Sequence, residues 1–84
     1  MTYRVEIARP AQKSLAALDG SIRPRVITAI RALAENPHPP GSLKMVGREG
    51  YRIRIGDYRV IYEVREMVLL VDVIEIGHRR EVYR

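Results

Sequence analysis

A two-residue turn, Gly56-Asp57, is the feature that most restricts how this chain can fold. Residues 51–55 and 58–62 flank the turn, and in each segment every second side chain is apolar or aromatic, as in half-buried strands. Two strands joined by so short a turn form a hairpin with a fixed register. In that register Arg54 lies directly opposite Arg59, with the two Cβ atoms about 5 Å apart.

Two arginines that face each other across a hairpin need an explanation, because like charges at paired positions destabilise a sheet by on the order of 1 kcal/mol. An anion held between them would supply one. The chain carries a net charge of +5, and 13 of its 15 cationic residues are arginines. Because the guanidinium fork matches phosphate geometry, this composition favours nucleic acid, an anionic surface or an acidic protein as the partner.

The first half of the chain predicts one strand and two helices. Tyr3 to Ile7 alternates as a strand does, and a helix follows from Pro10 to the Asp19-Gly20 break. Ser21 is the expected N-cap of a second helix, which ends at Asn36 because a proline follows. Two helices joined by so few residues form a helical hairpin.

The second half predicts strands only. Leu43 to Val46 is a possible strand start before the hairpin, and an apolar strand runs from about Met67 to Ile76. Since the last strand is apolar on both faces, we expect it inside the sheet, covered by the helices and by a partner. The prediction is a single α+β domain over residues 1–84, in the order β-α-α-β-β-β, with a mostly antiparallel sheet packed on the helical hairpin.

The expected sheet brings several polar residues toward Arg59. If the second hairpin turns at Arg65-Glu66, Asp72 faces Arg59, and residues 77–83 emerge beside the strand that carries this arginine. RNA cleavage by the 2′-hydroxyl requires no metal: it needs a proton acceptor, cations for the phosphate and an acid for the departing 5′-oxygen. This surface can offer all three. The side chains that we expect to converge are Arg54, Arg59, His78, Arg79, Arg80 and Tyr83.

Other classes of site are disfavoured by composition. The chain has no cysteine and only two histidines, His38 and His78, so we expect neither a metal nor a cofactor. No apolar run approaches the roughly 20 residues of a membrane span, and the N-terminus lacks a signal-peptide core. We therefore expect a soluble cytoplasmic protein without membrane contact.

Two segments, Tyr51 to Val64 and Ile74 to Tyr83, resemble the RelE/ParE superfamily of toxins from bacterial and archaeal toxin–antitoxin systems. The helical hairpin and the Leu43-Lys44 approach to the sheet also fit, so that the resemblance covers nearly the whole chain. In the RelE branch, such a toxin enters the ribosomal A site and cleaves the messenger RNA there. The ParE branch shares the fold and poisons DNA gyrase without cleaving RNA.

The resemblance also implies roles for individual residues. The catalytic set would be Arg54, Arg59, Arg79 and Tyr83, and the substrate-binding set would be Arg52, His78 and Arg80. Arg59 would contact the scissile phosphate, Arg79 would stabilise the transition state or activate the leaving group, and Tyr83 would orient the nucleotide and take part in proton transfer.

One position departs from the family pattern. The basic pair of the hairpin is lysine in the best-studied RelE pattern, whereas here it is Arg52 and Arg54. A guanidinium with a pKa above about 12 is a poor general base. Either Arg54 acts electrostatically while Tyr83 or His78 handles the proton, or the nuclease is weak.

Three functions are open at this point: RelE-like messenger cleavage, ParE-like gyrase poisoning, and binding of RNA or a partner without catalysis. Arg59, Arg79 and the terminal tyrosine favour cleavage, and the lack of exposed aromatic platforms disfavours simple RNA binding. The partners that the resemblance implies are a cognate RelB-like antitoxin, the ribosomal A site with its messenger, and operator DNA for the toxin–antitoxin complex.

Overall fold

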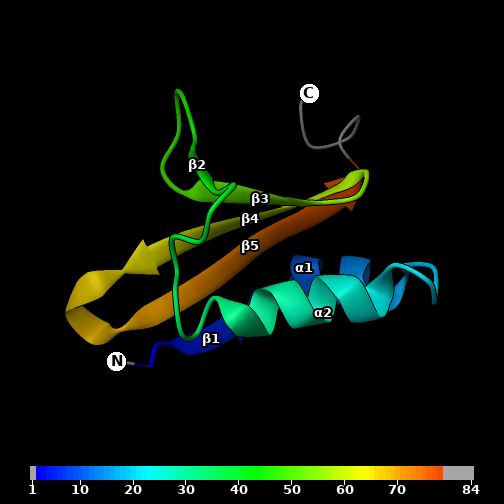
Figure 1. Cartoon of the computed structure of the whole chain (residues 1–84), viewed down its shortest axis with the longest axis horizontal. Helices are drawn as coiled ribbons and strands as arrows, with labels where there is room; N and C mark the ends of the chain where they lie inside the picture. The colour runs from blue at the N-terminus through cyan, green and yellow to red at the C-terminus, as the bar shows by residue number, and fades with distance from the viewer. Residues whose placement is uncertain (1, 79–84) are drawn as a thin grey trace.

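The computed structural model describes residues 2–78, which form a five-stranded sheet with two helices on one face (Figure 1). The strand order is β1-β5-β4-β3-β2; β1 runs parallel to β5 and all other neighbours are antiparallel. This confirms the α+β fold with a mostly antiparallel sheet. The elements are β1 (Arg4–Ile7), α1 (Arg9–Ala16), α2 (Arg23–Ala32), β2 (Leu43–Lys44), β3 (Tyr51–Ile55), β4 (Tyr58–Arg65), the short 3-10 helix η1 (Glu66–Val68) and β5 (Leu70–His78).

The two helices are joined as predicted, but the second begins later than expected. Ser21 is not its N-cap: α2 starts at Arg23 after Ile22, and the Ser21 hydroxyl instead donates to Asp19. The Arg23 guanidinium donates to three backbone carbonyls near the end of α1, those of Leu15, Ala16 and Leu18. A cation at the C-terminal end of a helix satisfies carbonyls that have no partner within that helix, so Arg23 fixes where the two helices meet.

The second helix also ends earlier than the predicted Asn36. Leu33, Ala34 and Glu35 each bond to the carbonyl three residues before, which tightens the last turn and ends the α-helical pattern at Ala32. The chain then enters the proline-rich loop.

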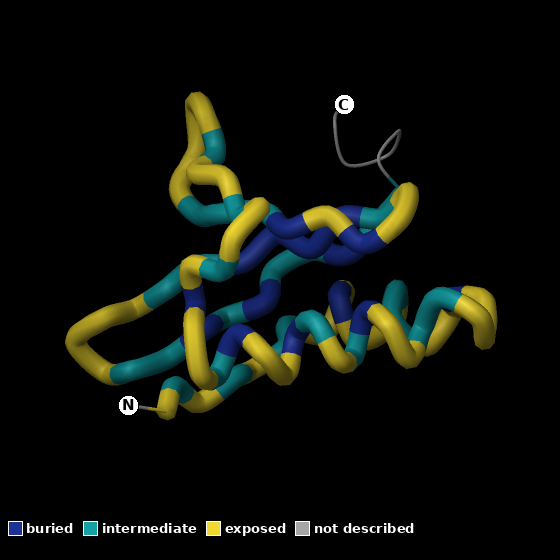
Figure 2. Tube along the Cα trace, in the orientation of Figure 1, coloured by how far each residue is buried: buried dark blue, intermediate teal, exposed yellow. Residues whose placement is uncertain are grey.

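The core fills the space between the helices and the sheet (Figure 2). Its largest fully buried side chain is Tyr62 in β4. The Tyr62 hydroxyl donates to the Pro37 carbonyl at 2.7 Å, and burial raises its pKa, so the hydroxyl stays a donor. This bond fastens the proline-rich loop to the sheet. The other buried core residues are Ala11, Leu18, Val26, Ile30, Leu33, Ile53, Ile55, Val60, Val71, Val73 and Ile76.

We expect Tyr62→Phe to lower the free energy of unfolding by about 1–3 kcal/mol, because it leaves the buried Pro37 carbonyl without its donor. Urea denaturation followed by circular dichroism measures the change. Tyr51→Phe is the matched control, since the Tyr51 ring stacks on Tyr62 but is only partly buried. Equal stability of wild type and Tyr62→Phe would contradict this account of the loop.

A second contact anchors the same loop at the tip of the β4–β5 hairpin. The Glu66 carboxylate accepts a hydrogen bond from the Tyr3 hydroxyl and lies 3.4 Å from Nε2 of His38. The Tyr3 hydrogen bond, followed by the His38 contact, lowers the pKa of Glu66; the same bond raises the pKa of Tyr3. Glu66 thus joins β1, the proline-rich loop and η1.

The stabilisation from Glu66 should depend on pH. A carboxyl whose pKa is lower in the folded state stabilises the fold above its ordinary pKa of 4.5 and loses that effect as pH falls through the folded value. We therefore expect wild type to be more stable than Glu66→Gln at neutral pH and the difference to shrink in acid. Chemical denaturation at several pH values checks this, and a difference that grows in acid would contradict it.

The β4–β5 register differs from the predicted one. Four residues, Glu66 to Leu69, connect the strands, with Leu69 in the left-handed region at φ 50°, and a bulge shifts the register between Ile61 and Tyr62. As a result Arg59 pairs with Gly77, and the prediction that it faces Asp72 was wrong. The last strand begins at Leu70, and Met67 and Val68 form an exposed tip. As expected, β5 lies inside the sheet, between β1 and β4.

Candidate functional site: an arginine row on the distal face

The face of the sheet opposite α1 and α2, which we call the distal face, carries the three hairpin arginines. The register of β3 and β4 confirms the prediction: Arg54 pairs with Arg59, and Arg52 pairs with Ile61. The intervening residues, among them Ile53 and Val60, point into the core. Arg52, Arg54 and Arg59 therefore lie on one face of the sheet.

Arg59 and Arg54 differ in burial although they are cross-strand partners. Arg54 is exposed, whereas Arg59 is 2% exposed and is the one charged residue buried among residues 2–78. Gly77, the partner of Arg59 on β5, adds no side chain to this row. A cation held in a poorly solvated position interacts more strongly with an arriving anion than a mobile surface cation does. The arginine pair thus consists of one buried cation, Arg59, and one exposed cation, Arg54.

Acidic and basic side chains gather in different parts of the distal face. Toward its β1 edge, Glu6, Asp72 and Glu63 are neighbours in one row across β1, β5 and β4. Arg4 pairs with Glu6 at 3.1 Å and Arg65 with Glu63 at 3.0 Å. These ion pairs largely balance the charge at this edge, whereas the distal side of β3 carries Arg52 and Arg54 and no carboxylate.

Two further charged residues lie on the distal face and were not among the predicted site residues. Glu75 pairs with Ile61, between the arginine row and the carboxylate row. Arg48 belongs to the loop between β2 and β3, which rises on the side away from the helices (Figure 1), and its Nη1 lies 3.7 Å from Oε1 of Glu75. No local sequence pattern identifies this pair, because the position of Glu75 depends on the length of the β4–β5 connection.

A pocket of about 400 Å³ opens at the free edge of β3, beside the arginines. The strand β2 has only two residues and pairs with β3 from Leu43 onward, so the preceding Pro40 and Gly41 leave a space beside Arg54. The lining combines apolar and cationic groups, and the volume falls within the range of small-molecule sites. The lining residues are Pro40, Gly41, Leu43, Arg52, Ile53 and Arg54.

Of the remaining predicted site residues, only His78 is among those that the structure describes, and it does not lie on this surface. His78 pairs with Tyr58, which packs against the core, and the two rings meet edge-on at 5.5 Å. The expected convergence of His78 with Arg54 and Arg59 is therefore wrong, since the shifted register turns His78 to the helix side. Arg79, Arg80 and Tyr83 lie outside the described residues.

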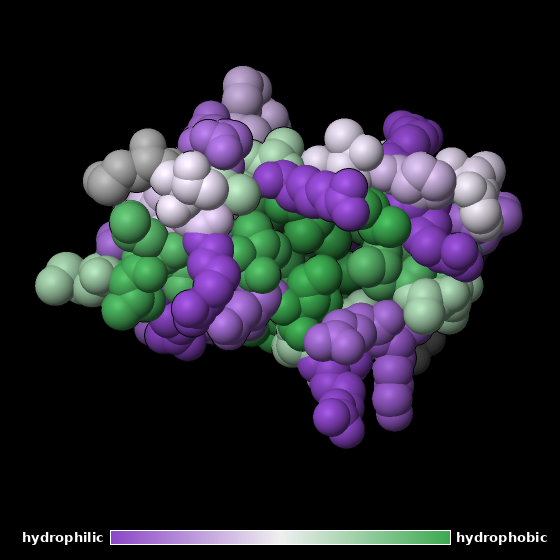
Figure 3. All heavy atoms as spheres, turned by 90° about the horizontal axis from the view of Figure 1, so that it is seen from below, coloured by the Kyte–Doolittle hydropathy of each residue, from purple (hydrophilic) through white to green (hydrophobic). Residues whose placement is uncertain are grey.

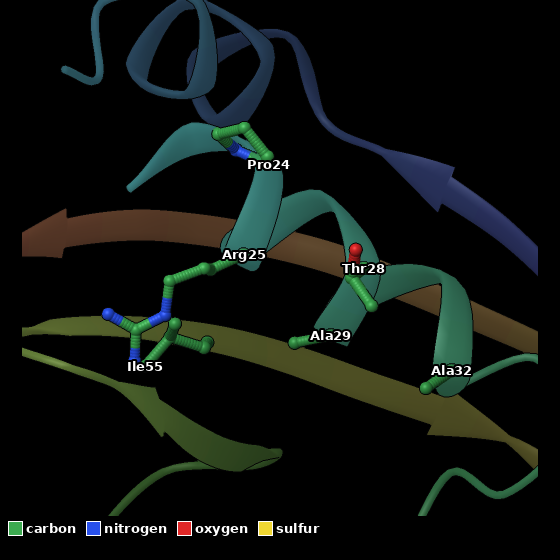
Figure 4. Close-up of a pocket in the computed structure, with 6 residues that line it drawn as sticks. All are labelled: Pro24, Arg25, Thr28, Ala29, Ala32 and Ile55. Atoms are coloured by element: carbon green, nitrogen blue, oxygen red, sulfur yellow. The ribbon is translucent and has the colours of Figure 1, made fainter. Parts of the chain in front are cut away.

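The helix side presents apolar surface instead of charge. In Figure 3, which shows this side, apolar side chains run across the middle of the molecule between charged ones. Grooves flank α2 on both sides, one toward β1 and one toward β3. In the second groove, small side chains such as Ala29 and Ala32 face the strand, and Arg25 extends beside Ile55 (Figure 4).

Within residues 2–78, no group of three histidine, cysteine or acidic residues is placed to hold a metal ion. Neither α1 nor α2, the two α-helices of the same range, has the length and apolar character that crossing a membrane requires.

The comparisons with known proteins identify the family. The family model of the ParE toxin of the type II toxin–antitoxin system parDE matches residues 5–83. The chain belongs to the RelE/ParE superfamily of toxins. It is therefore the toxin of a toxin–antitoxin module of the RelE/ParE type. No curated protein matches it at a significant level.

Solved RelE toxins share the whole fold. An archaeal RelE from a RelE–RelB complex of Pyrococcus horikoshii OT3 is 32% identical, with a TM-score of 0.80 over 94% of this chain and 97% of that one. A free E. coli RelE variant with two arginines changed to alanine is 26% identical, with a TM-score of 0.80 over 99% and 92%. A RelE from a Methanococcus jannaschii RelB–RelE complex is 27% identical, with a TM-score of 0.71 over 92% and 93%.

Proposed function

We propose that this toxin is a ribosome-dependent endoribonuclease that cleaves messenger RNA by attack of a 2′-hydroxyl on the adjacent phosphate, without a metal ion. The observation that carries the proposal is the pairing of exposed Arg54 with buried Arg59 on the distal face. Two guanidinium groups at this spacing can bind one phosphodiester from two sides. Since translation takes place in the cytoplasm, the toxin would act there.

The arginines would stabilise negative charge on the phosphate rather than transfer protons. Arg54 and Arg59 would hold the scissile phosphate and stabilise the charge that develops on it, and Arg52 would bind the neighbouring phosphate. From the family resemblance, Arg79 would stabilise the transition state, Arg80 would bind RNA and Tyr83 would protonate the leaving oxygen. The pocket at Leu43 offers room for a nucleotide beside Arg52 and Arg54.

A RelB-like antitoxin would be the partner that restrains this activity. The support is the apolar surface on both sides of α2, which an antitoxin segment can cover, and the basic distal face, which an acidic segment can neutralise. Solved relatives of the toxin come from RelE–RelB complexes. The complex would in turn bind operator DNA. An antitoxin encoded beside this gene that neither binds the chain nor relieves its toxicity would count against this partner.

A second candidate is a ParE-like poison of DNA gyrase, favoured by the name of the matching family model. One experiment separates the two functions. The purified toxin is added to translating ribosomes and the messenger is mapped by primer extension, while a gyrase supercoiling assay runs in parallel. Cuts within the A-site codon support the nuclease, and intact messenger with inhibited supercoiling supports the gyrase poison.

A further inference from the structure

Among residues 2–78, the arginine row supplies no proton acceptor for the proposed reaction. Removal of the 2′-hydroxyl proton requires a base, and a guanidinium with a pKa above about 12 cannot supply one near neutral pH. The ring of His78 lies on the helix side, against Tyr58. We propose that Glu75 is the general base of this reaction. The inference rests on the proposed ribonuclease function and adds a residue to its machinery.

The register places Glu75 next to the arginine row. Glu75 lies two residues before Gly77 on β5, and Gly77 is the partner of Arg59. Glu75 and Arg59 are therefore diagonal neighbours on the distal face, at a Cα separation of about 7–8 Å, a gap that a substrate held by Arg59 can span.

The other carboxylates of this face lie farther from the phosphate site. Glu63 is four residues from Arg59 along β4, which corresponds to about 13 Å. It is also paired with Arg65 at 3.0 Å. Asp72 and Glu6 lie in the same row as Glu63, on strands still farther toward the β1 edge. Glu75 is thus the carboxylate nearest to Arg59 among the distal-face residues that the structure describes.

Arg48 holds Glu75 in place without enclosing it. The Arg48–Glu75 contact of 3.7 Å is longer than a hydrogen bond, and 43% of the Glu75 side chain is exposed. The charged groups near Glu75 are three cations, Arg48, Arg52 and Arg59, and one carboxylate, Glu63.

In the reaction, the 2′-oxygen forms a bond to phosphorus while its proton passes to the Glu75 carboxylate. The bond between phosphorus and the 5′-oxygen breaks, and this oxygen takes a proton from the acid, which we assign to Tyr83. The products are a 2′,3′-cyclic phosphate and a 5′-hydroxyl. Proton exchange with water restores both side chains, so no oxidant, reductant or metal is needed.

The first test compares Glu75→Gln with Glu63→Gln, an isosteric change on the same face at an ion-paired carboxylate. On programmed ribosomes under single-turnover conditions, Glu75→Gln should cleave roughly 10²–10⁴-fold more slowly, as expected for loss of a proton-transfer group. Glu63→Gln should cleave near the wild-type rate.

The second test separates the base from the acid. A substrate with sulfur in place of the scissile 5′-oxygen has a good leaving group that needs no acid. Tyr83→Phe should regain activity on this substrate, and Glu75→Gln should remain slow. Two results would overturn the role of Glu75 while leaving the proposed ribonuclease function intact. One is a normal cleavage rate for Glu75→Gln when the wild type is active, and the other is recovery of Glu75→Gln activity on the sulfur-containing substrate. If the wild type leaves messenger intact, the proposed function fails and this role fails with it.

Discussion

Arg59→Ala is expected to slow messenger cleavage roughly 10²–10³-fold, the usual cost of removing one well-aimed group that stabilises transition-state charge. Arg59 is 2% exposed and pairs with Arg54, so its charge is held beside the site where the phosphate would bind. Single-turnover cleavage on programmed ribosomes measures the loss. From the resemblance, Arg79→Ala should be equally damaging and Arg84→Ala should have the least effect.

Removal of a buried side chain can also destabilise the fold, so this experiment needs a structural control. Arg59→Lys keeps the positive charge but removes the planar guanidinium group. We expect a cleavage rate between those of wild type and Arg59→Ala, because lysine cannot bind a phosphate bidentately. Arg25→Ala removes an arginine from the helix side and should leave the rate unchanged. Circular dichroism establishes that each variant is folded. A folded Arg59→Ala that cleaves at the wild-type rate would contradict the assigned role.

Tyr83→Phe is expected to lower the cleavage rate roughly 10²–10⁴-fold, because the phenol is assigned to protonate the departing 5′-oxygen. The expectation comes from the family resemblance, since Tyr83 lies outside the described residues. The ring of phenylalanine can still stack on a nucleotide, so the substitution isolates the hydroxyl group. Rates measured with saturating and limiting toxin separate a chemical defect from weaker binding.

Tyr3→Phe is the matched control for Tyr83→Phe. It removes a phenol that bonds to Glu66 at the β4–β5 tip, away from the arginine row, and should leave the cleavage rate unchanged. A normal rate for Tyr83→Phe would show that another group protonates the leaving oxygen.

The first hairpin could be predicted from the sequence because its turn is encoded locally. Glycine at Gly56 adopts φ 59°, and a two-residue connection leaves one register, so the pairing of Arg54 with Arg59 followed from the sequence alone. The alternation of apolar residues then fixed which face each arginine occupies.

The second hairpin could not be predicted in the same way. Its connection ends with Leu69 in a left-handed conformation that non-glycine residues seldom adopt, and no residue in Glu66 to Leu69 marks such a turn. The bulge after Ile61 shifts the register again. Neither feature is marked by a local turn signal, and together they decide that Glu75, not Asp72, neighbours Arg59. They also turn His78 toward Tyr58.

The start of α2 was missed for a related reason. Ser21 has the composition of an N-cap, but the side chain of Arg23 instead caps the end of the preceding helix. That bond joins two helices, so local propensity does not reveal it. The two-residue strand β2 was likewise too short for its pattern to define its end.

The most direct test of the central claim is to map the products on ribosomes programmed with a single defined A-site codon. We expect wild-type toxin to cut within that codon and to leave a 2′,3′-cyclic phosphate and a 5′-hydroxyl. We expect no such cut with Arg59→Ala or on ribosome-free messenger. Intact messenger in the presence of wild-type toxin that inhibits gyrase supercoiling would contradict it.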